Sequence, residues 1–210
     1  FQFGATLDML IFMRVLGLHT RSYKLAAQTA RRERDNLHSM AHTDPLTGLP
    51  NRRILDFAVS NAISARKPDE LVAVYMLDLD GFKQINDQFG HDTGDAFLIE
   101  VARRLQAALR SSDVVSRLGG DEFLVLSSGL RNEAQVRELG EKLLKAMHEP
   151  FNVSGHICHV GLTVGYGIAP ADGLDTRTLL KKADAAMYAG KQAGKGRVAG
   201  PAETTLAQPA

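Results

Sequence analysis

Cysteine is almost absent from this chain of 210 residues, in which Cys158 is the single example. One thiol excludes an intrachain disulfide, and it also excludes a metal site built from several cysteines. Because Cys158 lies in a run of alternating apolar residues, we expect it in the core. The missing disulfide framework fits a reducing cytoplasm.

A surplus of charge of either sign is also missing, because 25 Lys and Arg residues are balanced by 24 Asp and Glu and leave a net charge of +1. Such a balance does not indicate a strongly basic surface, so we expect no nucleic-acid partner and only local anion binding. The length, with 44% hydrophobic and 23% charged residues, suits one globular domain plus an appendage.

The apolar start of the chain is too short to be a complete membrane span. Residues 1–18 are interrupted by Asp8 and Arg14, and they fall short of the roughly 20 residues that cross a bilayer. A secretory signal fits poorly, since a basic start and a cleavage-like site are both missing. The chain has no initiator Met, so one interpretation is that it starts inside a longer protein, with this run as the cytoplasmic end of a last transmembrane helix.

No proline interrupts the first 44 residues, and a seven-residue apolar repeat runs through them. The repeat consists of Met9, Leu16, Tyr23, Ala30 and Leu37. This pattern predicts a long helix over residues 1–43 with a seam for a partner helix, so that two copies would form a parallel stalk. The residues support equally well a single amphipathic helix packed on its own domain or on a membrane, because Glu33 and Arg34 interrupt a second apolar row.

Beyond residue 44 the apolar spacing switches between helical and strand patterns. We expect a globular domain over residues 44–199 and a disordered tail over 200–210, which has little to bury. The mixed order predicts an α/β sandwich with helices around a central sheet. The expected helices cover residues 50–65, 82–87, 95–109, 132–148 and 176–193. The expected strands cover residues 71–78, 151–153, 157–168 and the two arms of a hairpin around residues 119 and 120.

The hairpin carries two acids at its turn. Apolar runs flank Gly119 and Gly120, and glycine supplies the positive φ that a tight hairpin turn requires. Because neither glycine has a Cβ, a charged ligand can approach the backbone beside Asp121 and Glu122. The residues of this segment, taken alone, favour an ordinary hairpin with a solvated acidic turn.

A second acidic cluster, Asp78-Leu79-Asp80, lies at the end of the strand expected at residues 71–78. Its near-continuous apolar run is typical of a strand buried on both faces. Carboxylates from this strand and from the hairpin would need a cation to offset their repulsion, about 4 kcal/mol for charges 4 Å apart at an effective dielectric of 20. Mg²⁺ suits such a site, because it combines one or two carboxylates with water and substrate phosphates.

Taken together, these segments resemble the GGDEF domains, most of whose active members are diguanylate cyclases. The matching pieces are Asp44 to Arg52 (DPLTGLPNR), Asp78 to Lys83 (DLDGFK), Asn86-Asp87, Gly90 to Asp95 (GHDTGD), Gly119 to Phe123 (GGDEF), and Ala183-Asp184 leading to Tyr188 and Lys191. The resemblance covers Asp44 to Val198 and implies an α+β fold: a central, mostly antiparallel sheet surrounded by helices, the palm-like nucleotidyl cyclase fold, preceded by a signalling helix.

The resemblance also implies an activity. In the family, two identical domains each hold one GTP and together form cyclic di-GMP and two pyrophosphates, so we expect a homodimer through the N-terminal helix. Two Mg²⁺ ions per site are implied, with Mn²⁺ as an alternative ion. By resemblance Asp78, the carbonyl of Leu79 and Asp121 bind the metal. Asp121 is also the candidate for deprotonating the attacking hydroxyl, while Glu122 supports either the metal or the structure.

The same resemblance assigns residues to the substrate. Asn86 and Asp95 match the guanine-recognition pair, and an Asp accepts from the N1 and N2 donors of guanine but meets an unpaired acceptor in adenine. Lys83 would neutralise phosphate charge, although the sequence without the resemblance is equally consistent with an ordinary surface lysine. The other expected substrate contacts are His91, Gly119, Gly120, Lys191 and Lys195.

The last of these segments departs from the family pattern. Gly190-Lys191 replaces the commoner Ala-Lys, and Gly194-Lys195-Gly196 replaces Gly-Arg-Asn. Lys195 thus stands where many relatives have Arg.

Arg110 and Asp113 form an RxxD sequence with five residues between it and Gly119. At this distance from the hairpin, relatives bind cyclic di-GMP at an inhibitory site, so the resemblance implies feedback inhibition. Arginine can fork onto phosphate or stack on guanine, and Asp can accept from a base edge.

Two alternatives remain beside the cyclase. A non-catalytic module could sense GTP or cyclic di-GMP through the same fold, but degenerate relatives usually lose the acids that this chain retains. A relaxed cyclase that also takes ATP is disfavoured by Asp95. The expected location is that of a cytoplasmic catalytic domain of a bacterial inner-membrane protein, attached to the membrane upstream.

Overall fold

The computed structural model of the chain describes residues 42–201. Residues 1–41 of the predicted N-terminal helix, which hold the stalk and the membrane end, lie outside this range. Helices and strands are interspersed along this part of the chain. The helices are α2 (Arg52–Ala65), α3 (Phe82–Phe89), α4 (His91–Ala108), α5 (Glu133–Ala146) and α6 (Thr176–Gln192). The strands are β1 (Leu71–Asp80), β2 (Val114–Gly119), β3 (Glu122–Leu130), β4 (Phe151–Val153), β5 (His156–Cys158), β6 (Gly161–Ala169) and β7 (Val198–Ala199).

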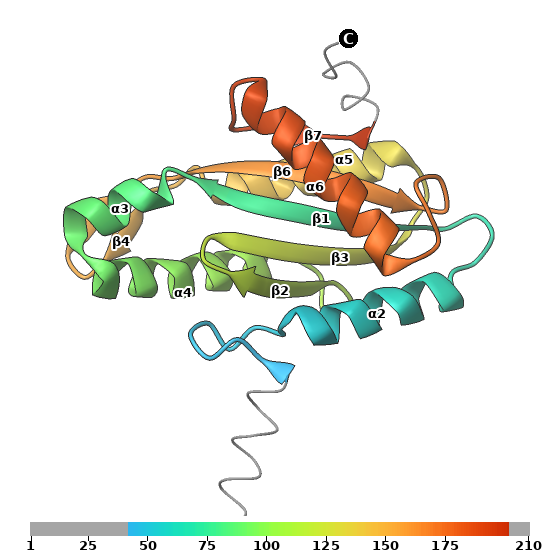
Figure 1. The fold of residues 1–210 in the computed structure, drawn as a ribbon, viewed down its shortest axis with the longest axis horizontal. Coiled ribbons are helices and arrows are strands. Elements are labelled where there is room, and N and C mark those ends of the chain that lie inside the picture. The colour runs from blue at the N-terminus through green and yellow to red at the C-terminus, as the bar shows by residue number, and fades with distance from the viewer. Residues whose placement is uncertain (1–41, 202–210) are drawn as a thin grey trace, which may run out of the picture. The chain divides into compact units, whose positions relative to one another are not determined.

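The strand β1 lies at the centre of a five-stranded sheet with the order β2-β3-β1-β6-β7 (Figure 1). Neighbouring strands run antiparallel except for the parallel pair β6 and β7. Residues Val72 to Leu79 of β1 are buried, which explains their near-continuous apolar sequence. The predicted class, a mostly antiparallel central sheet surrounded by helices, is confirmed.

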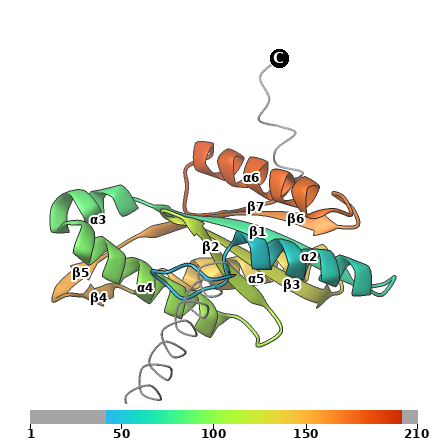
Figure 2. The same cartoon turned by 60° about the horizontal axis from the view of Figure 1, so that its bottom comes forward.

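Helices cover both faces of this sheet, with α6 on one face and α4 and α5 on the other (Figures 1 and 2). Successive residues of a strand point to opposite faces, so β1 contributes to two cores. Tyr75 and Leu77 join the core that contains residues of α4 and α5. Val74 and Met76 join the core formed with α2 and α6. By this alternation Asp78, two positions after Met76, lies on the α6 side of the sheet.

Two glycines allow α6 to lie directly on β6. A Cβ at residue 165 would overlap the carbonyl oxygen of Ala183, and a Cβ at residue 167 would lie 2.7 Å from the carbonyl oxygen of Leu179. The backbone of the helix therefore packs on the backbone of the strand. This close approach brings the last turn of α6, with Lys191, to the end of β1.

The predicted start of the fourth helix is wrong. We expected a loop up to Asp95, but α4 begins at His91 and only Gly90 separates it from α3. Gly94 is buried inside α4, where a Cβ would overlap the Oδ1 atom of Asn86. This glycine is therefore a packing contact between two helices and does not break the chain into a loop.

The strand predicted over residues 157–168 is in fact two strands in different sheets. The strand β5 pairs with β4 in a two-stranded sheet, whereas β6 starts at Gly161 and joins the main sheet. The aromatic ring of Phe151 in β4 packs on Phe97 of α4 at 4.5 Å between centroids. The small sheet therefore completes the core below α4.

The compact unit begins at His42, and among the helices of residues 42–201 none has the length and hydrophobicity needed to cross a bilayer. Gly200, which we expected in the tail, is buried close to the ring of Tyr166. The domain therefore extends slightly beyond its predicted end at residue 199, and residues 202–210 lie outside the described part.

Candidate active site

The two acidic segments that the sequence predicts to meet lie side by side at the end of β1. Asp78 is opposite Glu122 in the register of β1 and β3. The amide of Leu79 donates to the carbonyl of Asp121 over 3.4 Å. Carboxylates from two distant parts of the sequence therefore lie together where the strands β1 and β3 meet the hairpin turn. We call this end of the sheet, with Asp78, Asp121 and Glu122, the acidic edge.

The turn between β2 and β3 is open to a ligand. Gly119 ends β2 and Glu122 starts β3, so Gly120 and Asp121 form the tip. The φ angles of Gly119 and Gly120 are 147° and 56°, which side chains other than glycine rarely adopt. A Cβ built at either glycine would have no atom within 4 Å. The predicted glycine turn is thus present, with free space on its exposed side.

Among residues 42–201, the one cation paired with an acid of this edge is Lys191. The Nζ atom of Lys191 lies 2.6 Å from Oδ2 of Asp78. Burial raises the pKa of Asp78 above its usual value; Lys191 opposes this effect, and Asp121 and Asp80 add to it. Burial also raises the pKa of Glu122, and the charges of Asp78 and Asp121 raise it further. The negative charge at this edge therefore exceeds what Lys191 neutralises.

Asp184 is a further member of the acidic edge, to which sequence reasoning gave no role. It lies on α6 seven residues before Lys191, a spacing that places two side chains on the same side of a helix. Its charge also raises the pKa of Glu122. The signal in the sequence was this spacing of seven, which becomes informative only once Lys191 is known to face the acids.

The residues of the acidic edge fit a magnesium ion that is bound together with a nucleotide. Within residues 42–201, no three His, Cys, Asp or Glu side chains converge closely enough to hold a metal by themselves. Mg²⁺ needs no such cage, since it binds one or two carboxylates and takes water and phosphate oxygens for the rest. Asp78 and Asp121 can supply those carboxylates. Burial is the main cause of the raised pKa of Asp78, and a cation would offset both this burial and the added repulsion from Asp121.

The residues predicted for the base lie on the two helices that follow β1. The side chain of Asn86 in α3 packs against Gly94 of α4, and Asp95 is the next residue of α4. The predicted pair is therefore brought close together by the contact between these helices. His91 is the exposed first residue of α4, and Lys83 is exposed on α3.

The two predicted phosphate-binding lysines in the last turn of α6 and the turn after it have different surroundings. Lys191 is paired with Asp78, so a bound phosphate would compete with that carboxylate. Lys195 is exposed in a turn in which Gly194, Lys195 and Gly196 all have positive φ, at 116°, 60° and 58°. The amide of Lys195 donates to the carbonyl of Gly190 over 3.1 Å, which returns the chain to the end of α6.

Arg117 holds the turn of Gly120 and Asp121 in place through hydrogen bonds, although sequence reasoning gave it no role. Its Nε and Nη2 atoms donate to the carbonyl of Gly120 at 3.1 and 2.8 Å. Its Nη1 atom donates to both carboxylate oxygens of Asp44 at 3.0 and 3.2 Å. Thr47 also donates to Asp44, from its amide and its hydroxyl. The sequence carried no signal for this role beyond the position of an arginine two residues before the glycines.

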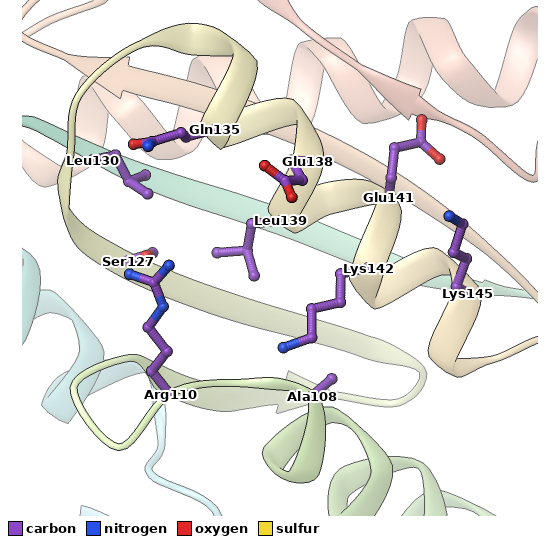
Figure 3. A pocket seen from close by; sticks show the side chains of 10 residues that line it. All are labelled: Ala108, Arg110, Ser127, Leu130, Gln135, Glu138, Leu139, Glu141, Lys142 and Lys145. Atoms are coloured by element: carbon purple, nitrogen blue, oxygen red, sulfur yellow. The ribbon is translucent and has the colours of Figure 1, made fainter.

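The RxxD residues form a closed turn beside a cavity. The carboxylate of Asp113 accepts from the amide of Arg110 at 3.0 Å and from the hydroxyl of Ser127 at 2.8 Å. Asp113 is thus engaged within the protein, while the guanidinium of Arg110 makes no ion pair with any residue of 42–201. Arg110 borders a cavity of about 480 Å³ between this turn, β3 and α5. Figure 3 shows the charged ends of Arg110 and Lys142 pointing into it, with Glu138 on the same side.

Comparison with known protein families identifies the family of this domain. Residues 41–197 match the family described as diguanylate cyclase, GGDEF domain. The chain belongs to the GGDEF domain family. It is 42% identical over 179 residues to the bifunctional diguanylate cyclase/cyclic di-GMP phosphodiesterase MucR of Pseudomonas aeruginosa, covering 85% of this chain and 26% of MucR.

Other curated relatives carry both kinds of name. The chain is 39% identical over 166 residues to the diguanylate cyclase TpbB of Pseudomonas aeruginosa, covering 78% of this chain and 38% of TpbB. It is 35% identical over 167 residues to the cyclic di-GMP phosphodiesterase PdeR of Escherichia coli, covering 80% of this chain and 25% of PdeR. The chain therefore spans well under half the length of these relatives.

Solved structures agree with this membership. The GGDEF domain of TpbB superposes with a TM-score of 0.71 at 37% identity, covering 73% of this chain and 97% of that domain. The GGDEF domain of DgcB from Caulobacter crescentus, solved in complex with c-di-GMP, gives a TM-score of 0.69 at 26% identity, covering 77% of this chain and 96% of that one. The chain is thus a GGDEF domain in sequence and in fold.

Proposed function

We propose that this GGDEF domain is an active diguanylate cyclase, which condenses two GTP molecules into cyclic di-GMP and two pyrophosphates. The observation that carries the proposal is the meeting of Asp78, Asp121 and Glu122 beside an open glycine turn, with Lys191 at 2.6 Å from Asp78. Relatives of more than 35% identity include proteins named as diguanylate cyclases, which supports the same activity here.

The reaction consists of two equivalent substitutions at phosphorus. In each, the 3′-oxygen of one GTP bonds to the α-phosphorus of the other, and the bond from that phosphorus to the oxygen bridging to the β-phosphate breaks. The hydroxyl proton passes to the carboxylate of Asp121, and pyrophosphate leaves. Because each domain holds a single GTP, two copies must face each other, for which the predicted stalk over residues 1–43 would supply the pairing.

Asp78, Asp121 and the carbonyl of Leu79 would hold the two magnesium ions implied by the family. When bound, Mg²⁺ neutralises triphosphate charge and lowers the pKa of the attacking hydroxyl. The side chains of Lys83, Lys191 and Lys195 would bind the phosphates, since an ammonium provides a compact positive charge.

The base would bind at the contact between α3 and α4. Asp95 would accept from the N1 and N2 donors of guanine, and Asn86 would bind the same base. His91, exposed at the start of α4 and four residues before Asp95, would contact the same nucleotide. Adenine presents an acceptor where Asp95 needs a donor, so ATP should be a poor substrate.

We further propose that cyclic di-GMP inhibits the enzyme at Arg110. The guanidinium borders the cavity of about 480 Å³ and has no ionic partner among residues 42–201, so it is available for phosphate or guanine. Asp113, already bound to Ser127, would shape the turn as well as contact the ligand. We place the domain on the cytoplasmic side of a bacterial inner membrane, where GTP is present.

A second candidate is a binding module without catalysis. The observation in its favour is the ion pair of Lys191 with Asp78. In this pair the residue predicted to bind phosphate is bonded to the residue predicted to bind the metal. Some relatives of similar identity are named as phosphodiesterases, so their GGDEF parts need not be the catalytic parts of those proteins.

Incubation of the purified chain with GTP and Mg²⁺, followed by mass spectrometry of the nucleotides, tests the two candidates. The cyclase predicts cyclic di-GMP and pyrophosphate in a ratio of one to two, and loss of both products in Asp121→Ala. Binding of GTP without any product would support the second candidate. Full activity in Asp121→Ala would remove this residue from the mechanism.

A further inference from the structure

Asp80 is an acid at the end of β1 whose carboxylate is bound by the neighbouring strand β6 and by the turn after α6. Its Oδ2 atom accepts hydrogen bonds from the hydroxyl of Thr163 at 2.7 Å and from the amide of Gly196 at 3.1 Å. The amide of Gly196 also lies 3.2 Å from the hydroxyl oxygen of Thr163. Thr163, on the neighbouring strand β6, is completely buried. These three groups form a small network between the centre of the sheet and the turn after α6.

The network holds a backbone that would not adopt this shape unaided. Lys195 has a φ of 60°, a conformation that is unfavourable for a residue with a Cβ. The amide of Gly196, next to Lys195, is the group that the network binds. A charged acceptor makes a stronger hydrogen bond than a neutral one, so the Asp80 carboxylate suits this task.

The remaining oxygen of Asp80 indicates what the position selects for. Oδ1 is buried and has no hydrogen-bond partner among the described residues, which is unfavourable for a carboxylate. A residue chosen only for packing would avoid this arrangement. The free-energy penalty is understandable if the fixed turn, and not the stability of the strand end, is what the aspartate serves.

Lysine at position 195 makes such a fixed turn more important. An arginine presents a planar fork that is pre-organised for phosphate, whereas a lysine is a point charge on a flexible stem. A fixed backbone at Lys195 limits the region that its ammonium can reach. The geometry of that backbone depends on Asp80 and Thr163.

We propose that Asp80 and Thr163 are positioning residues that hold the turn of Lys195 so that its ammonium meets the β- and γ-phosphates of the nucleotide. The inference rests on the proposed function, because it assigns these phosphates to the site. It adds two residues that act through Lys195 and touch no substrate themselves.

The test uses the full chain with Thr163→Val, which keeps the shape of the side chain and removes the hydroxyl. With Mg²⁺ present, we expect the Kd for GTP to rise about tenfold, as for one lost charge-assisted hydrogen bond. The Kd for GMP, which lacks the β- and γ-phosphates, should stay within twofold. Thr163→Ser, which retains the hydroxyl, should restore GTP binding. Asp80→Ala, which removes the acceptor of both hydrogen bonds, should behave like Thr163→Val.

A double variant identifies the route. If Thr163 acts through Lys195, then Thr163→Val should weaken GTP binding no further in the Lys195→Ala background. Hydrogen exchange of the Gly196 amide gives a readout that needs no ligand, and it should accelerate at least tenfold in Thr163→Val but not in Thr163→Ser.

Unchanged exchange at Gly196, equal weakening of GTP and GMP binding, or additive effects in the double variant would each overturn the inference. A wild-type chain that binds GTP but forms no cyclic di-GMP would contradict the proposed enzyme and leave this inference intact. A wild-type chain that does not bind GTP would contradict both.

Discussion

Arg117 is bonded to Asp44 through an ion pair in which both side chains are largely buried, with 10% and 14% of their surface exposed. The same guanidinium donates twice to the carbonyl of Gly120, in the acidic turn. A single side chain thus connects the segment that enters the domain with the tip of the hairpin. The position of Asp121 consequently depends on residues far from it in the sequence.

Replacement of Arg117 by Ala should destabilise the domain and displace the turn. The variant leaves the carboxylate of Asp44 without its buried cation and the carbonyl of Gly120 without its donors. We expect a loss of about 3 kcal/mol in the free energy of unfolding, measured by urea denaturation. Product formation should fall at temperatures at which the variant is still folded.

Arg52→Ala is the matched control for that variant. Arg52 lies 3.9 Å from Asp56, and both side chains are exposed, at 62% and 45%. Removal of such a surface pair should change stability by less than about 0.5 kcal/mol. Similar losses in the two arginine variants would show that the link between Asp44 and the turn has no special weight.

Asp44 should make stability depend on pH in the acidic range. Burial alone would raise the pKa of its carboxyl, but hydrogen bonds from Thr47 and Arg117 outweigh burial and hold the pKa below the usual 3.8. Between the two pKa values the unfolded chain binds more protons, so this contribution is complete above about pH 4 and is lost as the pH falls through the folded value. Urea denaturation from pH 3 to pH 7 should therefore show the gap between wild type and Asp44→Asn shrinking below pH 4. A gap that stays constant down to pH 3 would contradict the assignment.

Gly165→Ala should be strongly destabilising, because the added methyl would overlap the carbonyl of Ala183 in the backbone of α6. We expect a loss of about 3 kcal/mol in unfolding free energy, since a helix backbone cannot move aside as a side chain can. Gly140→Ala is the comparison, because its nearest contacts would be with the side chain of Val198, with Cγ1 at 2.7 Å, and not with a backbone atom. If Gly140→Ala proves as damaging as Gly165→Ala, the close packing of α6 on β6 is not what requires the glycine.

Arg110→Ala should relieve product inhibition while leaving the reaction itself intact. Arg110 borders the cavity beside α5 and lies outside the acidic edge, so its loss should affect only the binding of cyclic di-GMP. The initial rate of pyrophosphate release, measured against added cyclic di-GMP, should give an inhibition constant at least tenfold higher than for wild type. Undiminished inhibition in the variant would place the inhibitory site elsewhere.

Sequence patterns gave the sheet and most helices because their signals are local. The apolar run of β1 and the glycines of the hairpin each predict one element from a few adjacent residues. Gly94 misled the prediction of α4, because a glycine that serves helix packing is indistinguishable in sequence from one that breaks a helix. Only the contact with Asn86 shows which role it has.

In the candidate site too, the residues with local sequence signals could be predicted and those with long-range partners could not. The acids were predictable because a strand that ends in Asp78 and a turn that carries Asp121 are both readable, and the family motif joins them. Arg117 and Thr163 were not predictable, because their roles come from partners more than 60 positions away in the sequence. Long-range hydrogen bonds of this kind leave no periodicity in a single sequence.

The central claim is that Asp78 and Asp121 jointly bind a divalent ion that holds the triphosphate of GTP. Calorimetric titration of GTP into the chain, with and without Mg²⁺, tests it most directly. The account predicts that Mg²⁺ tightens binding at least tenfold in the wild type, and that Asp78→Asn and Asp121→Asn each abolish this dependence on the metal. Binding of GTP that is indifferent to Mg²⁺, or a dependence that survives either substitution, would contradict it.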